Sequence, residues 1–276
     1  MMTTDQTQQT PVSNWEGGRE PFKASYGKLM MWYFLLSDAF TFAGFLISYG
    51  ALRFSSPTWP VPDFVFSSLP GGIHHKPLIF VTFMTFVLIV SSVTMVRAVQ
   101  EGHRYNKKGV ALWMTLTIVG GLIFLACQAW EWSTLMGKEH MTIHVNPFGT
   151  HIESGTYLDG DGHDVQKGDQ FTAGKSYLIH KHGDEWAPLR YQTESGEIKQ
   201  QQFGPKAFGA LFFFITGFHG FHVFSGVVFL SIILVNVLSG IYANRKNHYE
   251  MVEKIGLYWH FVDLVWVFVF LVFYLL

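Results

Sequence analysis

Five runs of apolar residues, each long enough to cross a lipid bilayer, constrain the fold of this 276-residue chain more than any other feature. About 20 residues of helix span a hydrocarbon core of about 30 Å. The runs cover residues 28–52, 78–99, 110–135, 207–238 and 256–276. In lipid each backbone N–H and C=O needs a partner within its own segment, and the runs lack the alternation of barrel strands. The sequence therefore predicts an all-α membrane protein, a polytopic bundle of five transmembrane helices.

Composition agrees with a multi-pass membrane protein and excludes several other classes. The chain is 49% hydrophobic and only 14% charged, which is too apolar for a soluble domain of this size. Its formal net charge of -1 provides no basic field, so we expect no nucleic acid partner. The single cysteine, Cys127, rules out both a disulfide framework and a thiolate metal cluster.

Lysine and arginine gather in the loops on one side of the predicted bundle. That side carries Arg19, Lys23, Lys28, Arg97, Arg104, Lys107, Lys108, Arg245, Lys246 and Lys254. The short loop on the opposite side has only Arg53 and Lys76. Because positive loops stay in the cytoplasm, we expect a cytoplasmic N-terminus and a C-terminus on the outer face.

The chain divides into four parts by composition. Residues 1–27 form a polar cytoplasmic segment, 28–136 hold the first three helices, and 206–276 hold the last two. Between them, residues 137–205 are polar, and the predicted topology places them on the outer face. They are predicted to form a small β-rich insertion.

Within this insertion, short strand patterns alternate with turn residues. Residues 156–158, 176–179 and 190–193 are predicted strands, and residues 159–162 and 194–197 are predicted turns. The run 159–164 also has a superficial likeness to a calcium loop. It lacks the glycine at the sixth position and the glutamate at the twelfth, so a hairpin turn is the favoured interpretation.

The histidines of the insertion fit no closed tetrahedral metal pattern, and a wet polar loop is favoured over a metal site. They are His140, His144, His151, His163, His180 and His182.

Ionisable residues inside the apolar runs are expensive to place in lipid and therefore mark the candidate functional positions. Asp38 lies near the middle of the first run, where a bare carboxylate would take up a proton or find a donor. The others come in pairs three residues apart, which share a helix face. These pairs are Gln128 and Glu131, His219 and His222, and His260 and Asp263. Gly217 and Gly220, also three apart, are expected to allow a close helix crossing.

Three interpretations of the paired histidines His219 and His222 are open. They could supply haem or copper ligands from adjacent turns of one helix. Their glycine and aromatic neighbours, with acidic groups on other helices, fit interhelical or lipid-facing polar contacts better. A proton relay is a third interpretation.

Two long motifs resemble subunit III of the haem–copper cytochrome c oxidases. They are Trp259-His260-Phe261-Val262-Asp263 and Thr216-Gly217-Phe218-His219-Gly220-Phe221-His222-Val223. Upstream, Phe124, Leu125, Gln128 and Glu131 are similar to the family's FL-x-x-Q-x-x-E, and Ser37-Asp38 is similar to its SE pair. Thr85, Leu88, Ile89, Ser91 and Ser92 are similar to its NT-x-x-LL-x-S segment.

The chain departs from the family pattern at several points. Asp38 stands where the family has glutamate, and Met84 stands where it has asparagine. Family members commonly have seven helices, of which the first two are absent here. The 137–205 insertion is not a usual family feature.

The resemblance implies an accessory oxidase subunit in a bacterial inner membrane. Such a subunit binds no cofactor directly, because haem and copper lie in partner subunits I and II, and it contacts phospholipids and supports proton uptake. Cytochrome c or another donor would be reached through the partners. The implied buried polar set is Asp38, Glu131, His219, His222, His260 and Asp263. Supporting positions are Gln128, Thr85, Ser91, Gly217 and Gly220, and none is expected to be catalytic or to bind metal.

Three alternatives remain open from the amino-acid sequence alone. The first is subunit III of a quinol oxidase, which shares this subunit fold. The second is a stand-alone proton or solute transporter, although the chain has no internal repeat of the transporter kind. The third is a pure assembly scaffold.

Overall fold

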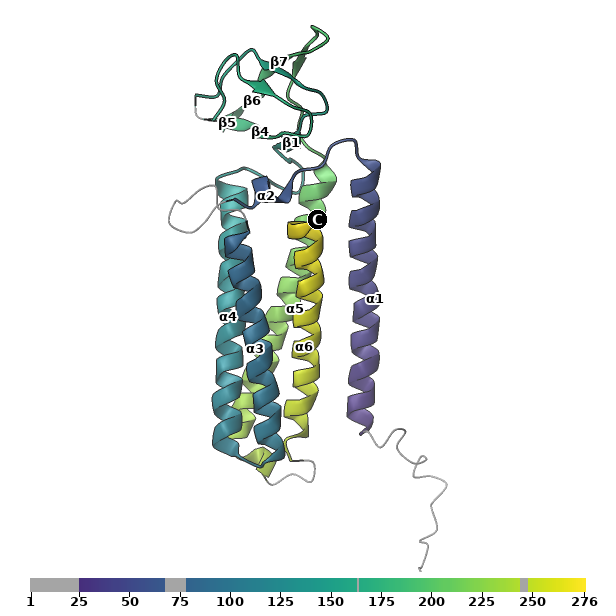
Figure 1. The fold of residues 1–276 in the computed structure, drawn as a ribbon. Coiled ribbons are helices and arrows are strands. Elements are labelled where there is room, and N and C mark those ends of the chain that lie inside the picture. The colour runs from purple at the N-terminus through teal and green to yellow at the C-terminus, as the bar shows by residue number, and fades with distance from the viewer. Residues whose placement is uncertain (1–24, 68–77, 163, 244–247) are drawn as a thin grey trace, which may run out of the picture.

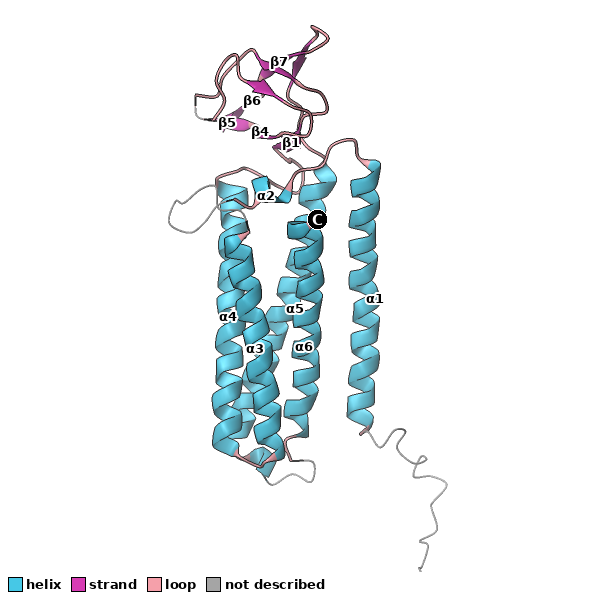
Figure 2. Cartoon of the chain, viewed as in Figure 1, coloured by secondary structure: helices cyan, strands magenta, loops and turns pink. Residues whose placement is uncertain are grey.

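The computed structural model describes residues 25–67, 78–162, 164–243 and 248–276 (Figure 1). In these ranges five helices are long and apolar enough to cross a membrane. They are α1 (Tyr26–Ser55), α3 (Ile79–His103), α4 (Lys107–Gly137), α5 (Lys206–Leu238) and α6 (Glu250–Phe270), the last continued by a π-helical segment, η3 (Leu271–Leu275). The predicted fold class is confirmed: the chain is mainly helical, with strands confined to one segment (Figure 2). Of the residues named above, Arg19, Lys23, Lys76, His163, Arg245 and Lys246 lie outside the described ranges.

The helices extend beyond the apolar runs at their charged ends. The largest difference is in α6, which begins at Glu250, six residues before the predicted start at residue 256. Its first turns carry Glu250, Glu253 and Lys254, and these charges ended the apolar run. A helix turn at the membrane edge can keep charged side chains in water, so hydropathy alone places such a boundary too late.

Four of the helices form a bundle, and α1 stands beside it (Figure 1). α1 packs against α5 and α6 through aromatic rings. The Phe42 ring lies 5.1 Å from that of Phe218 on α5, and the Tyr49 ring lies 4.3 Å from that of Phe273 in η3. Much of the remaining surface of α1 is exposed. Only a narrow side of α1 therefore joins the bundle.

Tryptophans fill the seam between α6 and α3. Trp259 Nε1 donates to Ser91 Oγ at 3.1 Å, and Trp266 Nε1 donates to Thr85 Oγ1 at 3.0 Å. Buried indoles need a partner for their N–H group, and small hydroxyl residues supply one while leaving room for the ring. The supporting positions Thr85 and Ser91 thus act as acceptors that anchor α6 on α3.

The end of the bundle opposite the turn between α3 and α4 carries a short helix, α2 (Pro62–Val65), and the β-rich segment (Figure 1). All its strand pairs are antiparallel, in the orders β1-β4, β3-β2-β7-β8 and β5-β6. The strands are β1 (Phe148–Thr150), β2 (Gly155–Tyr157), β3 (Gln170–Phe171), β4 (Ser176–Leu178), β5 (His180–His182), β6 (Glu185–Ala187), β7 (Arg190–Thr193) and β8 (Ile198–Gln200).

Strands occur at each of the three predicted places, as β2, β4 and β7, but their pairing differs from a simple succession of hairpins. β2 pairs with β3 and β7, and β4 pairs with β1. The stretch after β2 folds back on itself through the bond from Asp161 N–H to Val165 O, and the chain then returns as β3. Residues 194–197 do form the turn of the β7–β8 hairpin, where Gly196 has a φ of 87°.

The carboxylates that resembled a calcium loop make contacts within the chain. Asp159 accepts from Arg190 Nε at 2.8 Å and Nη2 at 3.0 Å, and these bonds lower the pKa of the Asp159 carboxyl. Asp161 Oδ1 accepts from Val165 N–H, and its other oxygen lies 3.5 Å from His180 Nε2. Both carboxylates therefore hold the loop in shape.

A buried histidine forms the centre of the β-rich segment. His151 is 3% exposed, stacks on Phe171 at 3.8 Å, and shares a hydrogen bond of 2.6 Å between Nε2 and the Tyr157 hydroxyl. Burial, with a smaller effect of Lys175, lowers the pKa of His151 to about 4. The imidazole is thus a neutral core side chain at pH 7.

Candidate functional site

A histidine–carboxylate contact joins α1 to α5 in the middle of the bundle. His222 Nε2 lies 2.9 Å from Asp38 Oδ2, and the two side chains are only 10% and 13% exposed. His222 Nδ1 lies 2.8 Å from the Phe218 carbonyl one turn earlier and must carry a proton to bond it. A bare Nε2 facing an ionised carboxylate would repel it. Asp38 Oδ2 makes no hydrogen bond of good geometry to the described residues, so the two groups meet as a close contact of ion-pair length.

Aromatic rings surround this pair. The Phe218 ring lies 4.6 Å from that of His222, and the Phe42 ring lies 5.4 Å from it. Such walls lower the local dielectric and make the contact between acid and imidazole stronger than it would be in water. Asp38 is therefore paired inside the chain, between α1 and α5, and does not face bulk lipid.

A second cluster forms around Glu131 near the outer end of α4. Its Oε2 accepts from Gln128 Nε2 at 3.1 Å and from the Tyr274 hydroxyl at 3.0 Å, and all three residues are buried. The pairing of Gln128 with Glu131 follows from their spacing. Tyr274 was missed, because a tyrosine close to the end of a span is ordinarily explained as an interface residue.

A third cluster links α3 to α6. Ser92 Oγ lies 2.6 Å from His260 Nδ1, and Ser92 also interacts with the Asp263 carboxyl. His260 and Asp263 share a face as their spacing predicts, but the residue that connects them is on another helix. Ser92 was part of the family-like segment and was not singled out as a site residue.

His219 does not join His222 in a common ligand set. Its ring is fully buried between Phe124, at 5.7 Å, and Trp266, at 5.1 Å, whereas His222 faces Asp38 on α1. Neither ring nitrogen of His219 has a hydrogen-bond partner among the described residues. In the same ranges no group of three or more histidine, cysteine, aspartate or glutamate side chains is arranged to hold a metal ion.

The two glycines of the α5 motif differ in their surroundings. A Cβ added at Gly217 would lie 2.8 Å from the Trp132 ring of α4, so this glycine is needed for a close approach. A Cβ added at Gly220 would meet nothing within 4 Å. Among the described residues, a close approach to a neighbouring helix is therefore present at Gly217 and not at Gly220.

An apolar groove of about 800 Å³ runs between α4 and α5 towards the end of the bundle that carries the β-rich segment. It is lined by Trp132, Met136, Thr142, Ile143, His144, Ala210, Leu211, Phe213, Phe214, Gly217 and Phe218. Phe218 belongs both to the groove and to the wall around His222, so the groove reaches the vicinity of the His222–Asp38 pair.

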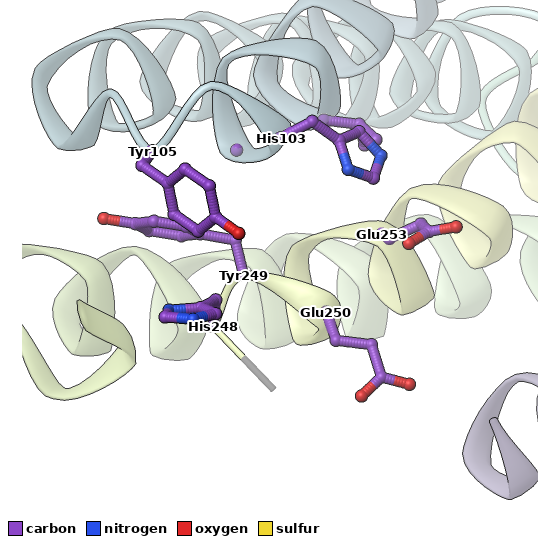
Figure 3. A pocket seen from close by; sticks show the side chains of 8 residues that line it. His103, Tyr105, His248, Tyr249, Glu250 and Glu253 are labelled. Carbon is purple, nitrogen blue, oxygen red and sulfur yellow. The ribbon is translucent and has the colours of Figure 1, made fainter. Parts of the chain in front are cut away.

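A polar pocket of about 230 Å³ lies at the opposite end of the bundle (Figure 3). His103 and Tyr105 line it from the end of α3, and His248, Tyr249, Glu250 and Glu253 line it from the start of α6. Glu253 forms an ion pair of 2.7 Å with Lys28 of α1. The sequence did not predict this pocket, because its residues come from the end of α3 and the start of α6, about 145 positions apart.

Known proteins resemble this chain along most of its length. The family profile described as "Cytochrome c oxidase subunit III" matches residues 196–276. A protein named cytochrome c oxidase subunit 3 from Alkalihalophilus pseudofirmus is 26% identical over 249 residues, covering 90% of this chain and 85% of the relative. Its namesake from Corynebacterium diphtheriae is 26% identical over 241 residues, 87% of this chain and 83% of the relative. That of Struthio camelus is 26% identical over 250 residues, 90% of this chain and 68% of the relative.

Proposed function

The chain belongs to the cytochrome c oxidase subunit III family, and from this premise we propose that it is a non-catalytic accessory subunit of a proton-pumping respiratory terminal oxidase. The observation that carries the proposal is the similarity over about 90% of the chain to subunits of that name. The partners would be the oxidase subunits I and II, and the electron donor, cytochrome c or quinol, would be reached through them.

Among the described residues, the three histidines of the spanning helices do not suit a haem or copper site, which supports redox centres in partner subunits. His222 uses one nitrogen on the Phe218 carbonyl and turns the other to Asp38. His260 uses Nδ1 on Ser92, and His219 is enclosed by aromatic rings. A ligand set for haem or copper needs free imidazole nitrogens that converge on one point.

Phospholipid contact is supported by the apolar groove between α4 and α5. A groove of about 800 Å³ with an apolar lining would accept an acyl chain, because burial of apolar surface away from water is favourable. Phe218, which lines the groove, packs against the His222–Asp38 pair, so a bound acyl chain would shield this pair from water. The role of the pair would be to keep a polar contact stable beside lipid.

Support for proton uptake comes from the pocket at the positively charged end of the bundle. It gathers two histidines and two glutamates, His103, His248, Glu250 and Glu253, on the side where lysine and arginine predominate. Imidazole and carboxylate side chains are the groups from which proton relays of membrane proteins are built. On this orientation the N-terminus is cytoplasmic, the C-terminus is on the outer face of a bacterial inner membrane, and the β-rich segment lies outside.

A stand-alone transporter is disfavoured by what fills the centre of the bundle. Trp259, Trp266 and Phe124 are each buried where the helices meet. Bulky side chains in close contact leave no room for a hydrated path along that centre. The pure scaffold predicts instead that variants of this chain turn over and pump normally once the complex is assembled.

Purification in a mild detergent tests the proposal. The tagged chain is expected to copurify with membrane subunits that show a visible haem spectrum, and metal analysis should find haem iron and copper in the complex. The isolated, folded chain should carry neither in stoichiometric amount. A chain that purifies alone from cells that express it at native level, or that itself holds a redox metal, would contradict the assignment.

A further inference from the structure

Two buried polar side chains, His219 on α5 and Gln128 on α4, have unpaired atoms inside the bundle. His219 is fully buried, and neither of its ring nitrogens has a hydrogen-bond partner among the described residues. Gln128 is 6% exposed, and its Nε2 donates to Glu131. In the same ranges, however, Gln128 Oε1 is unpaired. Buried polar atoms nearly always have a partner, so these three call for one.

The two side chains lie at the same level of the seam between α4 and α5. Two contacts align these antiparallel helices: Trp132 with Thr216, and Gly121 with Val227. The second contact lies eleven residues from the first along each helix, so the alignment is uniform between them. Gln128 is four residues from Trp132, and the residue four positions from Thr216 is Gly220. Gln128 is therefore level with Gly220 and adjoins the level of His219.

Gln128 and Gly220 also lie on the facing sides of the two helices. Gln128 is four residues from Phe124, whose ring lies 5.7 Å from that of His219, and a spacing of four shares a helix face. Gly220 lies four residues after one α5 contact with α4 and seven before the other, which again is the spacing of a single face. Even a Cβ added at Gly220 would meet no described residue within 4 Å. The space at this level of the seam is therefore larger than a methyl group.

A water molecule suits both the space and the unpaired atoms. A buried water needs room and at least two polar partners. Its O–H group would donate to Gln128 Oε1, which is an acceptor only. A neutral imidazole offers one donor and one acceptor nitrogen, and water can bond to either. A single water would therefore give a partner to His219 and to Gln128 at once.

We propose that one water molecule binds between Gln128 and His219, beside Gly220. It would complete a hydrogen-bonded line that begins at Tyr274, near the end of the bundle that carries the β-rich segment, and passes through Glu131 to Gln128. The water then carries the line on to His219. Tyr274 belongs to η3, Glu131 and Gln128 to α4, and His219 to α5, so the line fastens three segments together by polar contacts. The proposal does not depend on the function proposed above.

A density map of the purified membrane complex, at a resolution that shows ordered water, tests the site directly. A peak is expected at about 3 Å both from Gln128 Oε1 and from one ring nitrogen of His219. A direct bond between the two side chains with no such peak overturns the proposal. The same holds if both side chains are well defined and the space between them shows no density.

The effect of His219→Phe on thermal unfolding provides an independent test by its sign. A phenyl ring has a similar size and can keep the contact with Phe124, but it removes one partner of the water. The unfolding midpoint should therefore fall by a few degrees, since Gln128 Oε1 then has a less well bound partner. If His219 were merely unpaired, the change would remove a buried unsatisfied group and raise the midpoint. A raised midpoint overturns the proposal.

The same substitution in a Gln128→Met background is the matched control. Gln128→Met also loses the bond to Glu131, but this loss is common to both members of the second comparison and cancels. With the other partner of the water already gone, His219→Phe should lower the midpoint less than it does in the wild-type background. Equal falls in the two backgrounds overturn the proposal, even where His219→Phe alone is destabilising.

Discussion

The imidazole of His222 on α5 lies 2.9 Å from the carboxylate of Asp38 on α1, and this contact is the one polar link among the described residues that joins α1 to the bundle at mid-depth. Above and below it, α1 packs by aromatic rings, such as Tyr49 on Phe273. The pair therefore helps to set the register of α1 on α5. This makes Asp38 and His222 the first positions to test.

Asp38→Leu is expected to leave an assembled, spectrally normal oxidase that turns over more slowly or inactivates faster. The change removes the partner of a buried imidazole nitrogen, which costs about 1–3 kcal/mol. Asp38→Glu should be nearly silent, because it keeps the acid. Turnover, proton pumping and the half-life of activity during turnover are the measurements. If all three stay at wild-type values in Asp38→Leu, the carboxylate has no functional role.

A double-mutant cycle separates the pair from its individual members. If the two residues act mainly through each other, Asp38→Leu combined with His222→Leu should cost less than the two single changes added together. Thermal stability of the purified complex gives the coupling. Strict additivity would show that the 2.9 Å contact contributes nothing beyond the separate packing of each side chain.

The five helices could be predicted from the sequence because lipid allows few alternatives to a helix. The side chains that share one helix face could be predicted as well, since a spacing of three residues determines it for Gln128 and Glu131. The sequence does not predict which neighbouring helix each face contacts. The partner of Asp38 lies 184 positions away at His222, and nothing in either local pattern specifies the packing that brings them together.

Tyr274 and Ser92 were not predicted as site residues for a second reason. Tyr274 and Ser92 are ordinary near the end of a span or on a helix face, and they become informative only when Glu131 and His260 are seen beside them. In the β-rich segment the strand positions followed from local turn residues. Strand order depends on contacts such as β2 with β7, about 35 positions apart, which turn chemistry does not specify.

Gly217→Ala and Gly220→Ala form a matched pair that tests the packing of α5 on α4. The added methyl at Gly217 would meet the Trp132 ring at 2.8 Å, and that indole is held by its bond to Thr216 at 3.3 Å. Overpacking of this kind costs about 1–3 kcal/mol. At Gly220 the methyl meets nothing, so helix propensity alone acts and gives up to about 1 kcal/mol of stabilisation. Thermal unfolding should therefore shift down for Gly217→Ala and not for Gly220→Ala.

Cysteine labelling tests the proposed orientation. With Cys127 replaced by alanine, a cysteine at Lys167 in the β-rich segment should react in intact cells with a maleimide that cannot cross the inner membrane. A cysteine at Arg104, in the turn between α3 and α4, should react only after the membrane is broken. Labelling in the opposite order would place the N-terminus outside and reverse the sides given to the polar pocket and the β-rich segment.

The stability of the β-rich segment should fall in acid because of His151. Its pKa is lowered to about 4 in the folded segment, from 6.5 in an exposed histidine, so between these values the unfolded chain binds a proton that the folded one does not. The contribution of the neutral imidazole is complete above about pH 6.5 and is lost progressively as the pH falls towards 4.

Limited proteolysis of residues 137–205 between about pH 7.5 and about pH 4.5 measures this loss of stability. It uses an acid-tolerant protease whose own rate is calibrated at each pH. His151→Gln, which cannot take up this proton, should be less stable near neutral pH because it loses the stacking on Phe171, yet its cleavage rate should change less with pH. An equally steep dependence in His151→Gln would assign the acid sensitivity to other groups.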